Sequence, residues 1–291
     1  MGFPNGGGGP PASSVVGPGT YSDPPAVGVS SAWAKGDHYH GLPAAPAGPT
    51  IASFDTTVLT KLSLAPVAYW KLNDPVGSST AADSSGNGYT LTASGTVTFG
   101  EPSVVPSDSE TSAASDGSTG YLITSSAPAK LPVGASAFTW ICCANPAAGL
   151  ASALMGLAGQ SASTGLGWPG GLPSPGNGNQ FGIWNPTTGG NAGVSLGTAG
   201  GHLFGLSYDG YTAMMWMDGK PEPFQVGNNW NGRTTFGTVA GNVIVLAGGS
   251  VGGANPGVFN YSICDVGRVA IFAGVLTPKD WALLMQAFTG V

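Results

Sequence analysis

Apolar and polar residues alternate over short stretches along most of the chain, which is the pattern of strands that place one face in a core. Residues 67–73 form the first such stretch. Further strands are predicted at 89–92, 120–124, 137–144, 152–158, 180–184, 202–208, 212–218, 243–247 and 261–272. Glycine-containing turns separate many of them, as at 83–88, 208–211 and 218–219. Many short strands between such turns predict an all-β sandwich.

The closing stretch predicts a strand followed by a short capped helix. Alternation within residues 265–272 predicts a strand that is buried on one face only. Thr277 is a suitable N-cap, Pro278 suits the first helical position, and Asp280 stands where a capping box places its acid. Four apolar side chains then share one helical face: Trp281, Leu284, Met285 and Phe288. Upstream, residues 56–64 are predicted as one short helix or strand.

Four motifs in one order carry a family resemblance over about residues 67–291. They are the YWKL strand at 69–72, the DSSGNG turn at 83–88, the hairpin of 202–220 that contains YDG and ends in MDGK, and the closing strand and helix. Together they resemble laminin-G-like domains, which have the concanavalin A-like jelly-roll fold. The resemblance implies an all-β jelly-roll sandwich with a short C-terminal helix. Domains of this fold bind glycans, bind proteins, cleave polysaccharides or only fill space, so the fold alone does not give a function.

The N-terminal 65 residues differ in composition from the rest. The first 50 residues include eleven Gly and nine Pro, which prevent a helix or an inner strand. We therefore predict an extended anchoring arm over residues 1–65 and a jelly-roll domain over 66–291. Isolated aromatic residues along the arm are its expected anchors on a partner: Phe3, Tyr21, Trp33, Tyr39 and Phe54.

The arm also contains the sequence GDHYH at 36–40, which resembles the G-x-H-x-H motif of phage tail-fibre proteins. This resemblance implies a virion protein that is assembled in a host cytoplasm and attached to capsid or tail proteins. A homo-oligomer is expected, with a trimer as one arrangement. On a threefold axis, His38 and His40 of three chains would supply six imidazoles to one metal, which suits iron or nickel. The alternative is that both histidines are ordinary polar loop residues.

Charge narrows the range of partners. Charged residues make up 8% of the chain, the formal net charge is −6 and the isoelectric point is about 4.7. Because nucleic-acid binding requires a basic surface, no nucleic-acid partner is expected. No apolar run approaches the ~18 residues that would span a bilayer, so no membrane insertion is expected. The first six residues lack the basic and apolar regions of a secretory signal, which predicts that the chain is not secreted.

The three cysteines do not suggest a disulfide framework, because their number is odd and their spacing follows no pattern. Cys142 and Cys143 are adjacent in a predicted strand, so their side chains should point to opposite faces. We expect one to be buried and the other to be loosely covered. A bridge from Cys264 to either remains open.

Aromatic and amide side chains gather in one glycine-rich segment, as expected for a glycan-binding loop. The best run comprises Asn228, Asn229, Trp230, Asn231 and Arg233. Trp168 and Trp184 occupy similar loops. Tryptophan rings would stack on sugar rings while amides bond to hydroxyl groups. Alternatively, these tryptophans plug the end of the sandwich or face a neighbouring subunit.

Candidate catalytic and calcium-binding residues are few. Polysaccharide hydrolysis requires two carboxylates in one groove, and none of the three glutamates lies in an alternating acidic strand pattern. These are Glu101, Glu110 and Glu222. No enzymatic activity is therefore predicted, and a polysaccharide-degrading enzyme is the weakest interpretation. His202 in a predicted strand favours packing over catalysis.

No cofactor is predicted apart from a metal at His38 and His40. Calcium occurs in many laminin-G-like domains, and the loop carboxylates that could bind it here are Asp83, Asp116 and Asp209. Capping of the local turns explains these three residues equally well and is the favoured interpretation. The leading functional hypothesis is a structural phage virion protein, and the second is an adhesin for host surface glycans.

Overall fold

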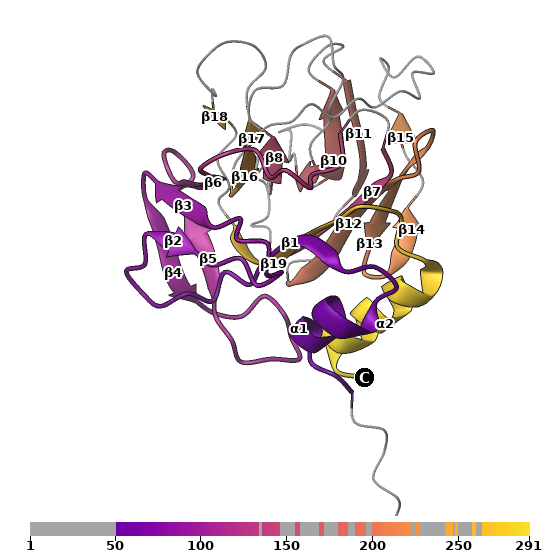
Figure 1. The fold of residues 1–291 in the computed structure, drawn as a ribbon, viewed down its shortest axis with the longest axis horizontal. Coiled ribbons are helices and arrows are strands. Elements are labelled where there is room, and N and C mark those ends of the chain that lie inside the picture. Colours follow the sequence, from indigo (N-terminus) through magenta and orange to yellow (C-terminus); the bar gives the residue numbers. More distant parts are fainter. Residues whose placement is uncertain are drawn as a thin grey trace, which may run out of the picture. The chain divides into compact units, whose positions relative to one another are not determined.

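The computed structural model describes residues 51–133, 136–145, 200–222, 242–246 and 264–291, together with short strands in the intervening segments (Figure 1). A compact unit extends from Pro49 to Val291. Its paired strands are all antiparallel, and two sheets form a sandwich with a short C-terminal helix. The predicted all-β sandwich is thus confirmed. No helix in the described part of the chain has the length and apolar character needed to cross a bilayer.

The larger sheet has eight strands. Seven follow one another in the order β14 (Lys220–Glu222), β13 (Ala213–Met217), β12 (His202–Tyr208), β7 (Phe138–Asn145), β19 (Asp265–Phe272), β5 (Ser112–Ser115) and β4 (Val97–Glu101). The eighth strand, β1 (Pro66–Trp70), also pairs with β19. Along one edge, β19 pairs with β7. Along the other edge its first part meets β5 and its second part meets β1.

The second sheet has the order β2 (Thr80–Ala81), β3 (Leu91–Ser94), β6 (Tyr121–Thr124), β16 (Val243–Val245) and β8 (Met155–Leu157). Inward-facing residues of the two sheets form one buried cluster, which includes Trp70, Leu122, Trp140, Phe204 and Ile271. Smaller sheets are formed by β9 (Pro169–Gly171), β10 (Gln180–Asn185), β11 (Gly190–Ser195) and β15 (Gln225–Val226), and by β17 (Gly248–Gly249) with β18 (Val258–Phe259).

Helical segments cover the other face of the larger sheet. The chain enters through α1 (Phe54–Thr56) and the π-helical turn η1 (Thr57–Lys61), and it closes with α2 (Pro278–Thr289). In Figure 1, α1 lies beside α2. Phe54 and Phe288 meet edge to face, with ring centroids 6.3 Å apart. The predicted capping box of α2 is confirmed, because Thr277 and Asp280 exchange both hydrogen bonds.

The strand β19 is buried on both faces, so the prediction of a half-buried strand was wrong. Val269 and Ile271 face the sandwich interior, whereas Ala270 and Phe272 face the helices. The same arrangement buries both adjacent cysteines, Cys142 toward the sandwich and Cys143 toward the helices. Their opposite orientation was predicted correctly, but neither is loosely covered, because a third layer lies over the sheet.

The domain begins earlier than the predicted boundary between residues 65 and 66. Phe54 is 1% exposed and Val58 is fully buried, both in the cluster that contains Trp281 and Phe288. Phe54 therefore belongs to the core of the domain and is not an arm anchor that a partner could contact. The other four predicted anchors, Phe3, Tyr21, Trp33 and Tyr39, lie outside the described residues.

Candidate functional site

A buried arginine joins three distant parts of the chain beneath the helical layer. Arg268 lies in a bulge of β19, at the point where the pairing partner changes from β5 to β1, and its φ of 58° is left-handed. Its Nη2 lies 2.9 Å from Asp108 Oδ2 and 3.1 Å from Glu110 Oε2. Its Nη1 donates to the carbonyl oxygens of Lys71 and Thr111. The guanidinium thus fastens the end of β1 to the loop that precedes β5.

Asp55 completes this ion cluster from the N-terminal helical segment. Its Oδ1 lies 3.0 Å from Arg268 Nε, at an angle outside that of a hydrogen bond, so this contact is ionic. Its Oδ2 lies 2.7 Å from Lys71 Nζ, and the Tyr69 hydroxyl donates a hydrogen bond to its Oδ1. Burial alone would raise the pKa of Asp55, but hydrogen bonds from Lys71 and Tyr69 and the charge of Arg268 lower it. A carboxylate held ionised in this way suits structural pairing and not proton donation.

A second pair of acids lies away from this cluster. Burial, and then the charge of Glu101, raise the pKa of Asp265. The two acids are carried by β19 and β4, with β5 between them. A carboxylic acid with a raised pKa near a second carboxylate is one requirement of a glycosidase. This position is therefore where the weakest interpretation, polysaccharide cleavage, would be tested.

The tip of the β12–β13 hairpin presents an exposed aromatic ring on a braced turn. Tyr211 is 79% exposed. The Asp209 carboxylate accepts hydrogen bonds from the backbone of Tyr211 at 2.8 Å and of Thr212 at 2.6 Å. From below, the buried Tyr208 hydroxyl donates to the Gly210 carbonyl oxygen at 2.7 Å. Because the backbone of this turn is already fixed, little backbone freedom would be lost when a ligand stacks on the ring.

The three loop carboxylates considered for calcium are occupied by backbone amides. One oxygen of Asp116 accepts from the amides of Ser118, Thr119 and Gly120. Hydrogen bonds from Thr119, followed by those from the other two amides, lower the pKa of Asp116. Asp83 likewise accepts from Tyr69, Ser85 and Tyr89. Turn capping is therefore what these carboxylates do, and the described residues contain no cluster of three potential metal ligands.

The strand histidine His202 is packed, as its position indicates. It is 9% exposed, and its Nδ1 lies 2.8 Å from Asp218 Oδ2. The other oxygen of this carboxylate, Oδ1, accepts a hydrogen bond from the Leu203 backbone amide. Burial alone would raise the pKa of Asp218, but the bonds from His202 and Leu203 lower it. The pair fixes the Asp218–Gly219 turn, where Asp218 has a left-handed φ of 50°.

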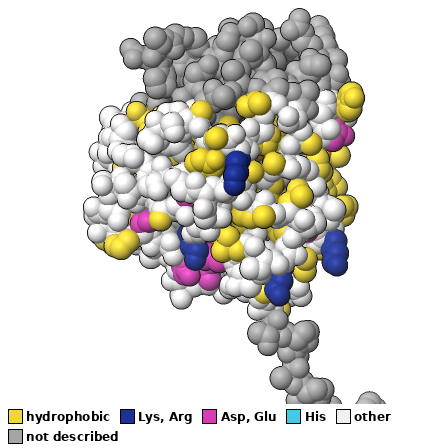
Figure 2. Space-filling view, viewed as in Figure 1, with side chains coloured by type: hydrophobic (Ala, Val, Ile, Leu, Met, Phe, Trp, Pro, Cys, Tyr) yellow, Lys and Arg dark blue, Asp and Glu magenta, His cyan; other side chains and the backbone are white. Residues whose placement is uncertain are grey.

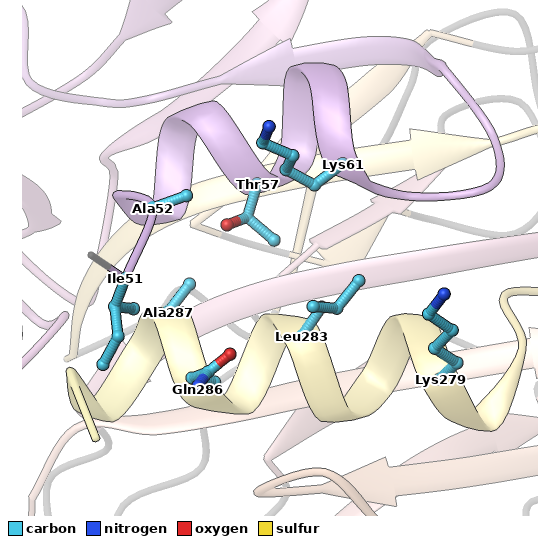
Figure 3. Close-up of a pocket in the computed structure, with 8 residues that line it drawn as sticks. All are labelled: Ile51, Ala52, Thr57, Lys61, Lys279, Leu283, Gln286 and Ala287. Atoms are coloured by element: carbon cyan, nitrogen blue, oxygen red, sulfur yellow. The ribbon is translucent and has the colours of Figure 1, made fainter. Parts of the chain in front are cut away.

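A groove separates the N-terminal helical segment from α2, and Figure 3 shows its lining. Its volume is about 310 Å³. Eight residues line it: Ile51, Ala52, Thr57, Lys61, Lys279, Leu283, Gln286 and Ala287. The sequence analysis did not find this site, because its two walls are more than 200 residues apart and neither wall carries a recognisable motif.

The side chains that were predicted to bind glycan or metal lie outside the described residues. Trp184 belongs to β10, whose side chains are outside the described residues. The other glycan candidates are outside them as well: Trp168, Asn228, Asn229, Trp230, Asn231 and Arg233. The same holds for the metal candidates His38 and His40. These assignments stay predictions.

No protein-family model matches the sequence, and no curated protein matches it. Solved structures do resemble the fold. Domain 4 of AbnA, a GH43 extracellular arabinanase from Geobacillus stearothermophilus, was solved in complex with arabinotriose. It superposes with a TM-score of 0.52 at 14% identity, over 77% of this chain and 99% of that chain.

Botulinum neurotoxin structures resemble the fold over a shorter share of their length. One of these structures is of botulinum neurotoxin type C, whose cell entry is dependent upon interaction with two ganglioside molecules. It gives a TM-score of 0.50 at 11% identity, over 77% of this chain and 51% of that chain. The binding domain of botulinum neurotoxin DC in complex with rat synaptotagmin II gives a TM-score of 0.50 at 13% identity, over 77% of this chain and 52% of that chain. The chain thus spans about half the length of these toxin chains. At such identities the similarity shows the β-sandwich fold alone.

Proposed function

We propose that the sandwich is a carbohydrate-binding domain that acts as an adhesin for surface glycans. The observation that carries this proposal is the superposition on nearly the whole of an arabinanase domain that was solved with arabinotriose. The ganglioside interaction of botulinum neurotoxin type C lends further support, since it also concerns a glycan-bearing ligand. On this proposal, catalysis is not the role of the domain.

A neutral oligosaccharide is the ligand class that fits the surface best. On the face of the molecule that Figure 2 shows, charged side chains are sparse, and neutral and hydrophobic surface lies between them. The chain carries a formal charge of −6 with only eight Lys and Arg. An anionic sugar would meet net repulsion at long range, whereas a neutral sugar needs ring stacking and hydrogen bonds to amides and hydroxyls.

Two aromatic positions are proposed as stacking platforms. Trp230, with its flanking asparagines, is the stronger candidate from the sequence. Tyr211 is the candidate that the structure adds, because it is exposed on a braced turn. Truncating Trp230 to alanine should lower glycan affinity at least tenfold, which corresponds to about 1.4 kcal/mol. Melting should remain unchanged if the ring is exposed.

The measurement is a glycan array with the full chain, followed by calorimetric titration of the best neutral hit. Trp230→Ala and Tyr211→Ala are compared with the conservative Trp230→Phe and Tyr211→Phe, which keep a ring and should retain most of the affinity. An array without any hit for the wild type would overturn the adhesin proposal. A large fall in melting temperature for Trp230→Ala would assign that residue to packing.

A role in a phage virion is our second candidate function, and it rests on the arm. The Gly/Pro-rich segment with GDHYH at 36–40 favours attachment of this chain to other virion proteins in a homo-oligomer. We therefore expect a variant lacking residues 1–49 to fold and bind glycan, yet fail to join particles. Co-assembly with the remaining virion components, quantified against the wild type, checks this. Incorporation at the wild-type level would show that the arm is not the attachment device.

A further inference from the structure

The groove between η1 and α2 has two chemically different ends. Lys279, Leu283 and Ala287 recur every four residues along one side of α2 and point toward the N-terminal helical turn (Figure 3). Lys61 and Lys279 supply the cations. Ile51, Ala52, Leu283 and Ala287 supply apolar surface, and Thr57 and Gln286 supply polar groups. At about 310 Å³, the groove is at the lower limit of the size of known ligand clefts, roughly 300–1,000 Å³.

The charge of this groove is opposite to that of the whole chain. Eight bases stand against fourteen acids in the sequence, yet the eight lining residues include two bases and no acid. The nearby acids are already engaged elsewhere. Asp280 accepts from Ser63 and Thr277, and Asp55 pairs with Lys71 and Arg268. Both groove lysines are exposed, and neither forms an ion pair within the described part of the chain.

The backbone of one wall adds a separate observation. Thr57 and Lys61 are the first and last residues of η1, which is a π-helical turn. Such turns are rare and occur frequently at functional sites. Here the wide turn carries two of the groove-lining side chains, and it is held to α2 through the buried Val58.

We infer that this groove is a docking site for an acidic peptide segment of a partner protein. A carboxylate of the peptide would pair with Lys279 or Lys61 at the cationic end of the groove, and a neighbouring apolar side chain would pack on Leu283 and Ala287. The amide of Gln286 would bond to the peptide backbone. The groove shares no residue with the proposed glycan platforms, so either activity could fail without the other.

The test uses two blocked tetrapeptides, acetyl-Glu-Ala-Leu-Leu-amide and its uncharged counterpart acetyl-Gln-Ala-Leu-Leu-amide. Binding to the full chain is followed by NMR shifts of the backbone amides of Thr57, Leu283, Gln286 and Ala287. We expect saturable millimolar binding of the glutamate peptide, at least fivefold tighter than that of the glutamine peptide. Raising the salt concentration from 50 to 500 mM should weaken the glutamate peptide selectively, because salt screens exposed charges.

Lys61→Gln combined with Lys279→Gln should remove the preference for the glutamate peptide, whereas Lys220→Gln, on an exposed lysine outside the groove, should leave it unchanged. Both sites are exposed, so folding should be preserved, and thermal melting verifies this. Equal binding of the two peptides, or no shift up to 10 mM, would overturn the inference. Shifts of the same amides on raising the protein concentration alone would also overturn it, since a second copy would then be the occupant.

Discussion

Replacing Arg268 by methionine is expected to lower the free energy of unfolding by about 3–5 kcal/mol, the usual cost of removing one partner from a buried ion pair. Arg268 is 1% exposed and holds Asp55, Asp108 and Glu110. Without the guanidinium these carboxylates repel one another and two carbonyl oxygens lose a donor. Calorimetric melting should show a fall of roughly 6–20 °C for a domain of this size.

The dependence of this loss on pH follows from Asp55. Its folded-state pKa is lowered, so its contribution to stability is present above the ordinary aspartate pKa of about 3.9 and disappears as the pH falls through the lower folded value. The gap between wild type and Arg268→Met should therefore be widest near neutrality and narrow below about pH 4. Lys130→Met is the control. Its exposed ammonium donates to the Asn87 side-chain oxygen, and less than about 0.5 kcal/mol should be lost when such a surface side chain is replaced. A pH-independent gap would mean that shape, and not charge, accounts for the loss.

Shortening the chain to residues 67–291 is expected to destabilise the domain strongly, whereas residues 50–291 should fold as the full chain does. The shorter fragment lacks Phe54 and Val58, and full burial of two such side chains is worth about 3–6 kcal/mol. The shorter fragment also lacks Asp55, which pairs with Arg268. It lacks Ser63 as well, whose amide and hydroxyl donate to the two carboxylate oxygens of Asp280. A typical domain has only about 5–15 kcal/mol in total.

The two fragments are compared by urea unfolding, with Phe54→Ala in the 50–291 fragment as an intermediate case. That substitution should cost about 3–5 kcal/mol, as truncation of a buried phenylalanine usually does. Equal midpoints for the two fragments would show that the N-terminal helical segment is dispensable for the stability of the domain.

Local sequence signals predicted the elements of this domain well. The capping box of α2 depends on residues three positions apart, and the strands β7 and β12 largely coincide with stretches that the sequence predicted as strands. The carboxylates of Asp83, Asp116 and Asp209 bond to amides close by in the chain, and turn capping could therefore be predicted from sequence. Such interactions need no knowledge of the tertiary arrangement.

Features that join distant segments could not be predicted in this way. Asp108 and Glu110 lie 160 and 158 residues from Arg268, and nothing in the alternation of β19 indicates that its arginine is internal. The burial of both faces of β19 depends on α1 and α2, which no pattern within the strand reveals. The groove has the same origin, because its walls come from the two segments of the domain that are farthest apart in sequence.

The pairing of α1 with α2 also sets how the domain would respond to tension. If the segment before Ile51 tethers the domain to a large object, a pull on that tether reaches the helix pair before it reaches any strand. The Phe54–Phe288 contact and the Ser63–Asp280 bonds would yield first. The hairpin of β12 and β13 contacts this helix pair through Trp216, which stacks on Trp281 of α2. Tension on the helical layer would therefore reach the base of the hairpin first, and only then its tip at Tyr211.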